Sequence, residues 1–302
     1  MKIGILGSPN AIESIWLEKE GKKRGHTVKR FSSKHFGFKL KDNKFEVISK
    51  IDFKSIDIFL VRGIYRSYFV KKIYFNKATE SLLLLRYIND ILKKPIVDER
   101  LARRPIIMSK MATSLDLSKE QLPQPTTYQF RDKDKVIKNI DTFTYPVIIK
   151  NPAGRKGKNI FKIDTKKELK SFMQKMPRVM PFLFQQYLPT DGDIRILVIG
   201  YRAIGAMKRL VIPGDFKANI SQGAEAQKYK LNKEIINLSE KAASLTKTEF
   251  AGVDIIKSEG KYYLIEVNRS PQFRGFKKYT KVDPSPYIID YLEKKVEKNK
   301  ST

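Results

Sequence analysis

The residue types that suggest chemistry gather in the stretch Phe250–Phe273. Two apolar runs of strand type, 250–256 and 261–267, flank a short polar turn, and this pattern predicts a β-hairpin. Each run carries one acidic residue, Asp254 in the first and Glu266 in the second. These two carboxylates are the first candidates for a functional site.

The two faces of this hairpin indicate which chemistry the site would support. The expected register contains two pairs, Ile256 with Tyr262 and Asp254 with Leu264. One face then carries Asp254, Leu264, Glu266 and Asn268. These side chains supply two carboxylates and one amide, with one apolar residue among them. Such oxygen ligands suit Mg²⁺, which completes its octahedron with water and substrate phosphates. We therefore predict a metal and phosphate site at Asp254, Glu266 and Asn268. The alternative is an ordinary hairpin with these acids on its solvated face.

Composition bounds the class of protein. The chain has 302 residues and 41% hydrophobic content, enough for more than one lobe. No apolar run approaches the ~20 residues of a membrane helix, and the N-terminal MKIGILGS reads as a strand, so we expect a cytoplasmic protein. Cysteine is absent, which excludes disulfides, thiolate metal sites and cysteine nucleophiles. The only histidines, His26 and His35, argue against a zinc site or a histidine-based hydrolase.

The charge balance indicates anionic partners. The formal net charge is +29, from 61 Lys plus Arg against 32 Asp plus Glu. A field of that sign attracts nucleic acid, phosphorylated cofactors or acidic peptides. Lysine is spread along the chain rather than clustered, so genome composition or habitat is an equal explanation.

The first part of the chain has the pattern of a parallel α/β domain. A strand at 2–7, a helix and a strand at 26–31 form a βαβ opening, and a buried strand at 57–61 ends in Arg62. Arg62 and the nearby Arg66 are placed to meet an anionic ligand at the carboxyl end of a strand, or they are solvated loop cations. Helices are expected at 79–93 and 106–117, and prolines then mark a domain boundary close to Leu122.

The second part alternates hairpins and helices. A strand at 147–150 leads into a loop that holds Gly154 and Gly157, and a second strand begins at Ile160. Glycines let backbone N–H groups approach phosphates, and Lys150 would neutralise their charge, although a plain hairpin turn has the same pattern. A helix at 166–175 and a strand at 182–188 follow.

Two further strands precede the hairpin with the two acids. They are expected to meet at Gly200, with Asp193 and Arg195 on one face of the first and Lys208 and Arg209 ending the second. An amphipathic helix at 231–246 separates these strands from the hairpin. We therefore expect an α/β protein with an α+β C-terminal lobe.

Taken together, these motifs make the chain resemble the ATP-grasp carboxylate–amine ligases, in particular the RimK-like α-L-glutamate ligases and lysine-biosynthesis ligases. The resemblance is carried by DIRILVIG and AIGAMKR (193–209), FKANISQGA (216–224), and AGVDII and LIEVNRSP (251–271). It implies an ATP-grasp fold behind an N-terminal domain with an open parallel sheet. The N-terminal domain would span 1–122 and the ATP-grasp domain 123–302, with subdomains of about 123–188 and 189–302.

The resemblance also implies roles for individual residues. Asp254, Glu266 and Asn268 would bind Mg²⁺ or Mn²⁺. The residues implied to bind ATP are Lys110 and Lys150 at the phosphates, Gly154 and Gly157 in the covering loop, Gln185, Gln186, Tyr187 and Leu188 at adenine, Asp193 near the ribose, and Lys208. Three residues would face the transferred phosphate or acyl group: Arg195, Arg209 and Asn219.

The activity implied by the resemblance is ADP-forming ligation. ATP would convert a carboxylate into an acyl phosphate, and an amine would then displace phosphate, with no protein nucleophile. The expected reaction adds glutamate or a similar amino acid to an acidic acceptor, either a small molecule or a peptide. A homodimer or homotetramer is common in the family, and neither a membrane nor nucleic acid is expected as a partner. The alternatives are an ATP-grasp kinase that acts on a hydroxyl group and a basic nucleic-acid-binding protein.

Overall fold

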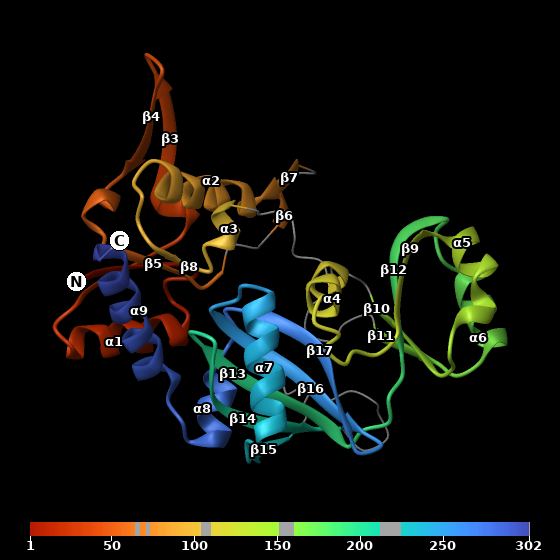
Figure 1. Cartoon of the computed structure of the whole chain (residues 1–302). Coiled ribbons are helices and arrows are strands. Elements are labelled where there is room, and N and C mark those ends of the chain that lie inside the picture. Colours follow the sequence, from red (N-terminus) through yellow and green to blue (C-terminus); the bar gives the residue numbers. More distant parts are fainter. Residues whose placement is uncertain (64–66, 71–72, 104–109, 151–159, 212–224, 302) are drawn as a thin grey trace.

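The structure is a computed structural model that describes the chain except for residues 64–66, 71–72, 104–109, 151–159, 212–224 and 302. Three sheets follow one another along the chain, each with helices against it (Figure 1). None of the described helices is long and apolar enough to cross a lipid bilayer.

The first sheet is parallel and has the strand order β2-β1-β5-β8. Its strands are β1 (Lys2–Leu6), β2 (Thr27–Phe31), β5 (Ile58–Val61) and β8 (Ile96–Val97). The helices of this region are α1 (Ile12–Lys23), α2 (Lys77–Asp90) and α3 (Arg100–Arg103), with short 3₁₀ turns at Ser33–His35 and Phe53–Ser55. Strands β5 and β8 are fully buried runs of Ile, Phe, Leu and Val, as both faces of a parallel sheet are covered, whereas the edge strand β2 exposes Thr27 and Lys29. The predicted parallel α/β opening is confirmed.

Two antiparallel hairpins belong to the same region and were not predicted. They are formed by β3 (Phe36–Lys41) with β4 (Lys44–Ser49) and by β6 (Ser67–Val70) with β7 (Ile73–Asn76). The β3–β4 hairpin extends away from the rest of the molecule (Figure 1).

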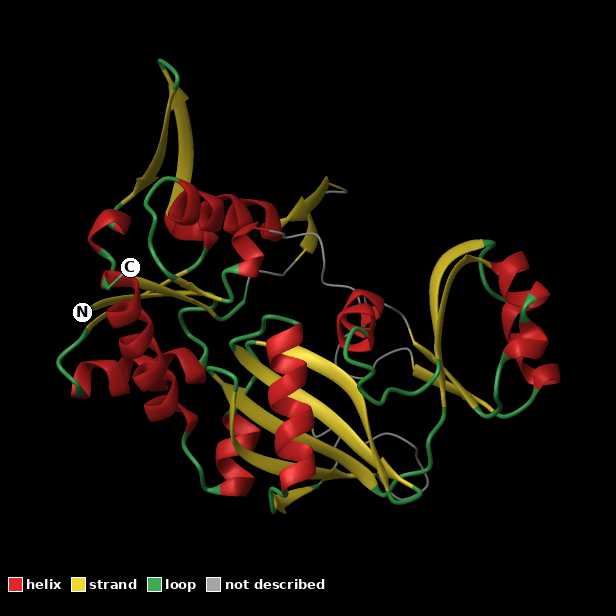
Figure 2. Cartoon of the chain, viewed as in Figure 1, coloured by secondary structure: helices red, strands yellow, loops and turns green. Residues whose placement is uncertain are grey.

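A second sheet follows α4 (Lys110–Ser118) and has the order β11-β10-β12-β9. Its strands are β9 (Thr127–Asp132), β10 (Val147–Lys150), β11 (Ile160–Ile163) and β12 (Val179–Gln186). Helices α5 (Lys133–Lys138) and α6 (Lys166–Gln174) cover one face, with a 3₁₀ turn at Ile140–Thr142 (Figure 2). The amphipathic α6 buries Leu169 and Met173 against this sheet. The other face of the sheet points toward the third sheet (Figure 1).

The third sheet is antiparallel, with the order β15-β14-β13-β16-β17. Its strands are β13 (Gly192–Ile199), β14 (Arg202–Leu210), β15 (Ala226–Tyr229), β16 (Phe250–Ser258) and β17 (Lys261–Arg269). Helix α7 (Lys233–Leu245) covers one face (Figure 1), and the chain ends with α8 (Arg274–Thr280) and α9 (Pro284–Lys300).

Alternation along β13 divides the residues of this sheet between two environments. Ile194, Ile196 and Val198 pack with residues of α7 in one apolar cluster. Leu197 and Ile199 face the other way and pack with β1 and α9. Asp193 and Arg195 share that second face, so the charged residues continue the surface that packs on the N-terminal domain.

The hairpin of β16 and β17 has a different register from the one expected. Asp254 lies opposite Glu266, not Leu264, because a β-bulge follows Asp254. Ile256 lies opposite Tyr263, and Leu264 opposite Ile255, with which it packs on the α7 side. The expected register and the placement of Leu264 beside the acids are therefore wrong. The bulge brings the two carboxylates directly opposite each other.

Candidate active site

The centre of the site is an ion pair between two neighbouring strands. Arg195 on β13 lies opposite Asp254 on β16, and its Nε and Nη2 each donate to one carboxylate oxygen at 2.7 Å. Asp254 is only 4% exposed. Two parallel N–H donors to one carboxylate form a strong and geometrically specific contact.

A second pair extends this arrangement along the same face. Arg209 on β14 lies opposite Asp193 on β13 and donates to both of its carboxylate oxygens, while its Nη2 lies 3.2 Å from Asp254 Oδ2. The Nδ2 of Asn268 donates to the same Asp254 oxygen at 3.1 Å. Two acids and two arginines therefore alternate across three strands, with the Asn268 amide at their edge.

The two aspartates respond differently to burial. Burial raises the pKa of Asp254, but Arg195 and Arg209 outweigh it and bring this pKa to about 2. For Asp193, burial outweighs Arg209 and raises the pKa to about 6. Asp254 is thus an ionised carboxylate at neutral pH.

Two lysines reach this face from other parts of the chain. Lys110, at the start of α4, donates to Glu266 Oε1 at 2.5 Å. Lys150, at the end of β10, donates to Gln185 Oε1 at 2.5 Å. Burial, and then the charge of Lys110, lowers the pKa of Lys150 to about 8. The two lysines therefore lie close enough to repel each other, which is the arrangement that a multiply charged anion relieves.

The end of β12 and the residue after it are held by backbone hydrogen bonds to neighbouring segments. The N–H groups of Gln186 and Tyr187 donate to the carbonyls of Thr126 and Pro146. The side chain of Gln185 is also occupied, because it accepts from Lys150 and donates to Thr127. Within the described part of the chain, the Leu188 N–H has no such backbone partner.

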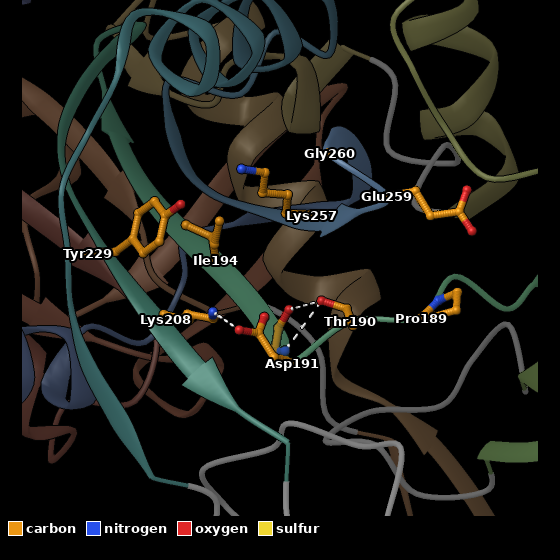
Figure 3. A pocket seen from close by; sticks show the side chains of 10 residues that line it. Pro189, Thr190, Asp191, Ile194, Lys208, Tyr229, Lys257, Glu259 and Gly260 are labelled. Atoms are coloured by element: carbon orange, nitrogen blue, oxygen red, sulfur yellow. Dashed lines mark hydrogen bonds and ion pairs between the residues drawn. The ribbon is translucent and has the colours of Figure 1, made fainter.

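One predicted residue lies away from the others. Lys208 is opposite Ile194 and therefore points to the α7 side of the sheet, where it pairs with Asp191. It lines a separate pocket of about 570 Å³ with Tyr229 and Lys257 (Figure 3). The cofactor-binding role of Lys208 stays a prediction, and the structure directs this lysine away from Asp193 and Arg209, because adjacent residues of a strand face opposite ways. Asn219, Gly154 and Gly157 lie outside the described residues.

The donor set fits a hard cation. The described residues contain no cluster of three His, Cys, Asp or Glu side chains that would hold a metal without other ligands. Asp254 and Glu266, with the Asn268 amide, instead offer two carboxylates and one neutral oxygen. This is the protein share typical of Mg²⁺, whose remaining positions go to water and phosphate oxygens.

Sequence reasoning missed one residue that shapes the site. Gly252 on β16 carries no side chain where a Cβ would lie 2.8 Å from the Pro271 ring and 3.6 Å from Arg195 Nε. The signal was available, since a glycine inside a strand often marks the close approach of another segment.

Comparison with known proteins places this geometry in a family. A family model described as the RimK-like ATP-grasp domain matches residues 108–292. The chain belongs to the RimK-like ATP-grasp family. The match contains every site residue that the structure describes, from Lys110 to Asn268.

Relatives of this RimK-like chain include ligases and synthases. It is 35% identical over 159 residues to a probable α-L-glutamate ligase 1 of Shewanella frigidimarina, covering 52% of this chain and 53% of that protein. It is 28% identical over 202 residues to human N-acetylaspartylglutamate synthase A, covering 64% and 52%. The chain thus spans about half the length of the curated relatives it matches.

Solved structures share the fold over nearly the whole RimK-like chain. The ATP-grasp ligase PsnB, complexed with a phosphomimetic variant of a minimal precursor, Mg and ADP, superposes with a TM-score of 0.73 at 20% identity over 97% of this chain and 98% of that one. A RimK domain ATP-grasp protein from Sphaerobacter thermophilus gives a TM-score of 0.66 at 16% identity, covering 97% and 99%. The predicted ATP-grasp fold is confirmed.

Proposed function

We propose that this protein is an ATP-dependent, ADP-forming ligase that joins a carboxylate to an amine through an acyl phosphate. The observation that carries the proposal is the alternation of Arg209, Asp193, Arg195 and Asp254 on one face, with Lys110 and Lys150 directed to the same place. Such a site supplies anchored cations for phosphates and acids for a cation.

The reaction has two steps. The substrate carboxylate attacks the γ-phosphorus of ATP, ADP departs, and an acyl phosphate forms. The amine then attacks the acyl carbon and loses a proton, so that an amide forms and inorganic phosphate leaves. Mg²⁺ or Mn²⁺, held by Asp254, Glu266 and Asn268, would neutralise the charge of the phosphates. Arg195 and Arg209 stabilise the charge that develops on the transferred phosphoryl group, because they are already in place before the reaction.

The nucleotide would bind between the second and third sheets. Lys110 and Lys150 hold its phosphates, and Asp254, Glu266 and Asn268 hold the cation. At the adenine, Leu188 supplies the N–H, since those of Gln186 and Tyr187 are already used. The roles of Asn219, Gly154 and Gly157 remain as implied by the resemblance.

The substrates are glutamate, or a similar amino acid, and an acidic acceptor. The glutamate ligases among the relatives support glutamate, and the structural neighbour PsnB, complexed with a precursor peptide, supports a peptide as one form of acceptor. The net charge of +29 supports an acceptor that is an anion.

The test is ADP release by the purified protein with Mg·ATP, glutamate and a panel of acidic acceptors. ADP release that requires both the amine and the acceptor is the expected result. ADP release with a hydroxyl substrate and no amine dependence would instead identify a kinase. Absence of turnover with every pair would contradict the proposed ligase.

A further inference from the structure

Arg62 occupies a position where parallel sheets bind ligands. The order β2-β1-β5-β8 reverses direction between β1 and β5, and ligands of such sheets lie outside the carboxyl ends of the strands at this point. Arg62 follows β5 directly. Gly7, which follows β1, would place a Cβ only 3.0 Å from the Arg62 Cβ, so a glycine there lets the ends of β1 and β5 approach each other closely.

The guanidinium of Arg62 is enclosed but mostly unpaired. Its central carbon lies 5.0 Å and 5.2 Å from the ring centroids of Phe250 and Phe273, and its Nη2 donates to the Pro271 carbonyl at 3.1 Å. Nε and Nη1 are buried and have no hydrogen-bond partner among the residues that the structure describes. Buried donors of a charged group that lack a partner are costly in free energy, so Arg62 favours a ligand that accepts hydrogen bonds.

The positive charge of Arg62 favours an anion as this ligand. Burial lowers the pKa of Arg62 to about 10, so it remains a cation at neutral pH. Glu13 and Asp98 oppose this lowering through their charges, but neither forms an ion pair with Arg62 among the described contacts. Nη2 has two hydrogens and Pro271 takes one. One edge of the guanidinium therefore still offers two parallel N–H groups, the geometry that a carboxylate accepts.

Arg62 is separated from the reaction site by a single residue. Pro271 accepts its hydrogen bond and also packs over Gly252, beside Arg195 Nε. An amino acid that presents its amine near Arg195 carries a carboxylate that does not react, and this group needs a cation a short distance away.

We propose that Arg62 binds a non-reacting carboxylate of the substrates, at a subsite bounded by the ends of β1 and β5 and by the turn after β17. The source is the α-carboxylate of the amino acid, or a spare carboxylate of the acceptor. Because these N–H groups are buried, the carboxylate reaches them when the turn at Ser270 and Pro271 moves away from β5, which releases the hydrogen bonds of Arg62 to Pro271 and of Ser270 to Val61. The assignment of the carboxylate to a substrate rests on the proposed ligase function.

Equilibrium binding tests the subsite without turnover. Glutamate, its α-amide and glutamine are titrated against the wild type and Arg62→Met, whose side chain fills the space between the two phenylalanines without charge. A second arm uses acceptors with and without an amidated spare carboxylate. We expect the wild type to prefer one free carboxylate by about 10- to 100-fold and Arg62→Met to lose that preference. The arm in which the preference disappears identifies the source.

Controls separate binding from packing. Arg86→Met, on the exposed face of α2, should bind like the wild type. If Arg62→Met does not fold, Arg62→Lys keeps the charge but loses the two-pronged contact, and it should retain only part of the preference. Equal preferences in the wild type and either Arg62 variant would overturn the subsite, and so would a wild type that binds acids and amides equally. ADP release in parallel judges the ligase reaction separately.

Discussion

Arg195 and Asp254 face each other across β13 and β16 and are joined by two hydrogen bonds of 2.7 Å. Arg209 approaches the same carboxylate at 3.2 Å, so Asp254 is shared between two guanidinium groups. A cation that enters this site would bind carboxylates, and a phosphate would bind guanidinium groups, that are already in position. The protein then needs little reorganisation during the reaction.

Removal of the Glu266 carboxylate should abolish most of the activity while the fold remains. Its side chain is 35% exposed and pairs with Lys110, so Glu266→Gln should unfold close to the wild-type temperature. Loss of a metal ligand should lower the rate of ADP release by about 100-fold or more. Glu259→Gln, in the exposed turn of the same hairpin, is the matched control and should be fully active. An active Glu266→Gln enzyme would remove the carboxylate from the site.

The pair of Arg195 and Asp254 should be coupled in stability. Asp254→Leu leaves Arg195 without its acid and Arg209 with Asp193 alone, and it should cost about 3–5 kcal/mol in the free energy of unfolding. The double variant Arg195→Met with Asp254→Leu should cost less than the sum of the single variants, by about 1–3 kcal/mol. Urea unfolding of the four proteins measures this coupling. Strict additivity would show that the pair contributes nothing as a unit.

Nucleotide affinity should depend on pH through Lys150. Its pKa is lowered to about 8 by burial and by Lys110, and an anion binds the protonated form. The Kd for Mg·ATP should therefore be constant below pH 8 and rise with pH above it, by up to about tenfold per unit. Lys150→Arg keeps its charge and should remove this dependence. A wild-type Kd that is flat between pH 7 and 10 would contradict the role of Lys150.

The two faces of the third sheet should differ in sensitivity. Lys208→Met removes a cation from the α7 side and should leave the KM for ATP within about twofold of the wild type, whereas Arg209→Met should lower the rate by about 100-fold or more. Steady-state kinetics of both variants decide this. A large effect of Lys208→Met on the KM for ATP would show that nucleotide binding reaches the α7 side.

Gly252 should tolerate no side chain. A Cβ there would lie 2.8 Å from Pro271, so Gly252→Ala should displace the turn after β17, cost about 1–3 kcal/mol of stability and slow turnover. Gly37→Ala, where nothing lies within 4 Å, is the control and should change neither quantity. Wild-type stability and kinetics in Gly252→Ala would show that Pro271 moves without consequence.

Much of the fold was predictable because its strands have strong local patterns. The strand Val147–Lys150 and the pair Gly192–Ile199 and Arg202–Leu210 follow the expected bounds closely. The β3–β4 hairpin was missed although Asp42 and Asn43 both adopt positive φ at its turn, a conformation that these residue types favour.

The site was predictable in its residue types but less so in its geometry. Asp254 and Glu266 were found, yet their direct opposition depends on a bulge, which adds one residue to a strand without a sequence signal. Lys208 was assigned to the nucleotide without regard to the face of the strand, although alternation puts it on the opposite face from Arg209. The hydrogen bond from Lys150 to Gln185 depends on the pairing of β10 with β12 in one sheet, and no local sequence pattern reveals that pairing.

The central claim is that a substrate carboxylate is phosphorylated and then displaced by an amine. The most direct measurement follows ¹⁸O from a labelled acceptor carboxylate in the presence of Mg·ATP and glutamate. The ligase predicts one ¹⁸O atom in each inorganic phosphate released, together with an amide product. Inorganic phosphate without ¹⁸O, or a phosphorylated product that keeps its phosphate when the amine is present, would contradict it.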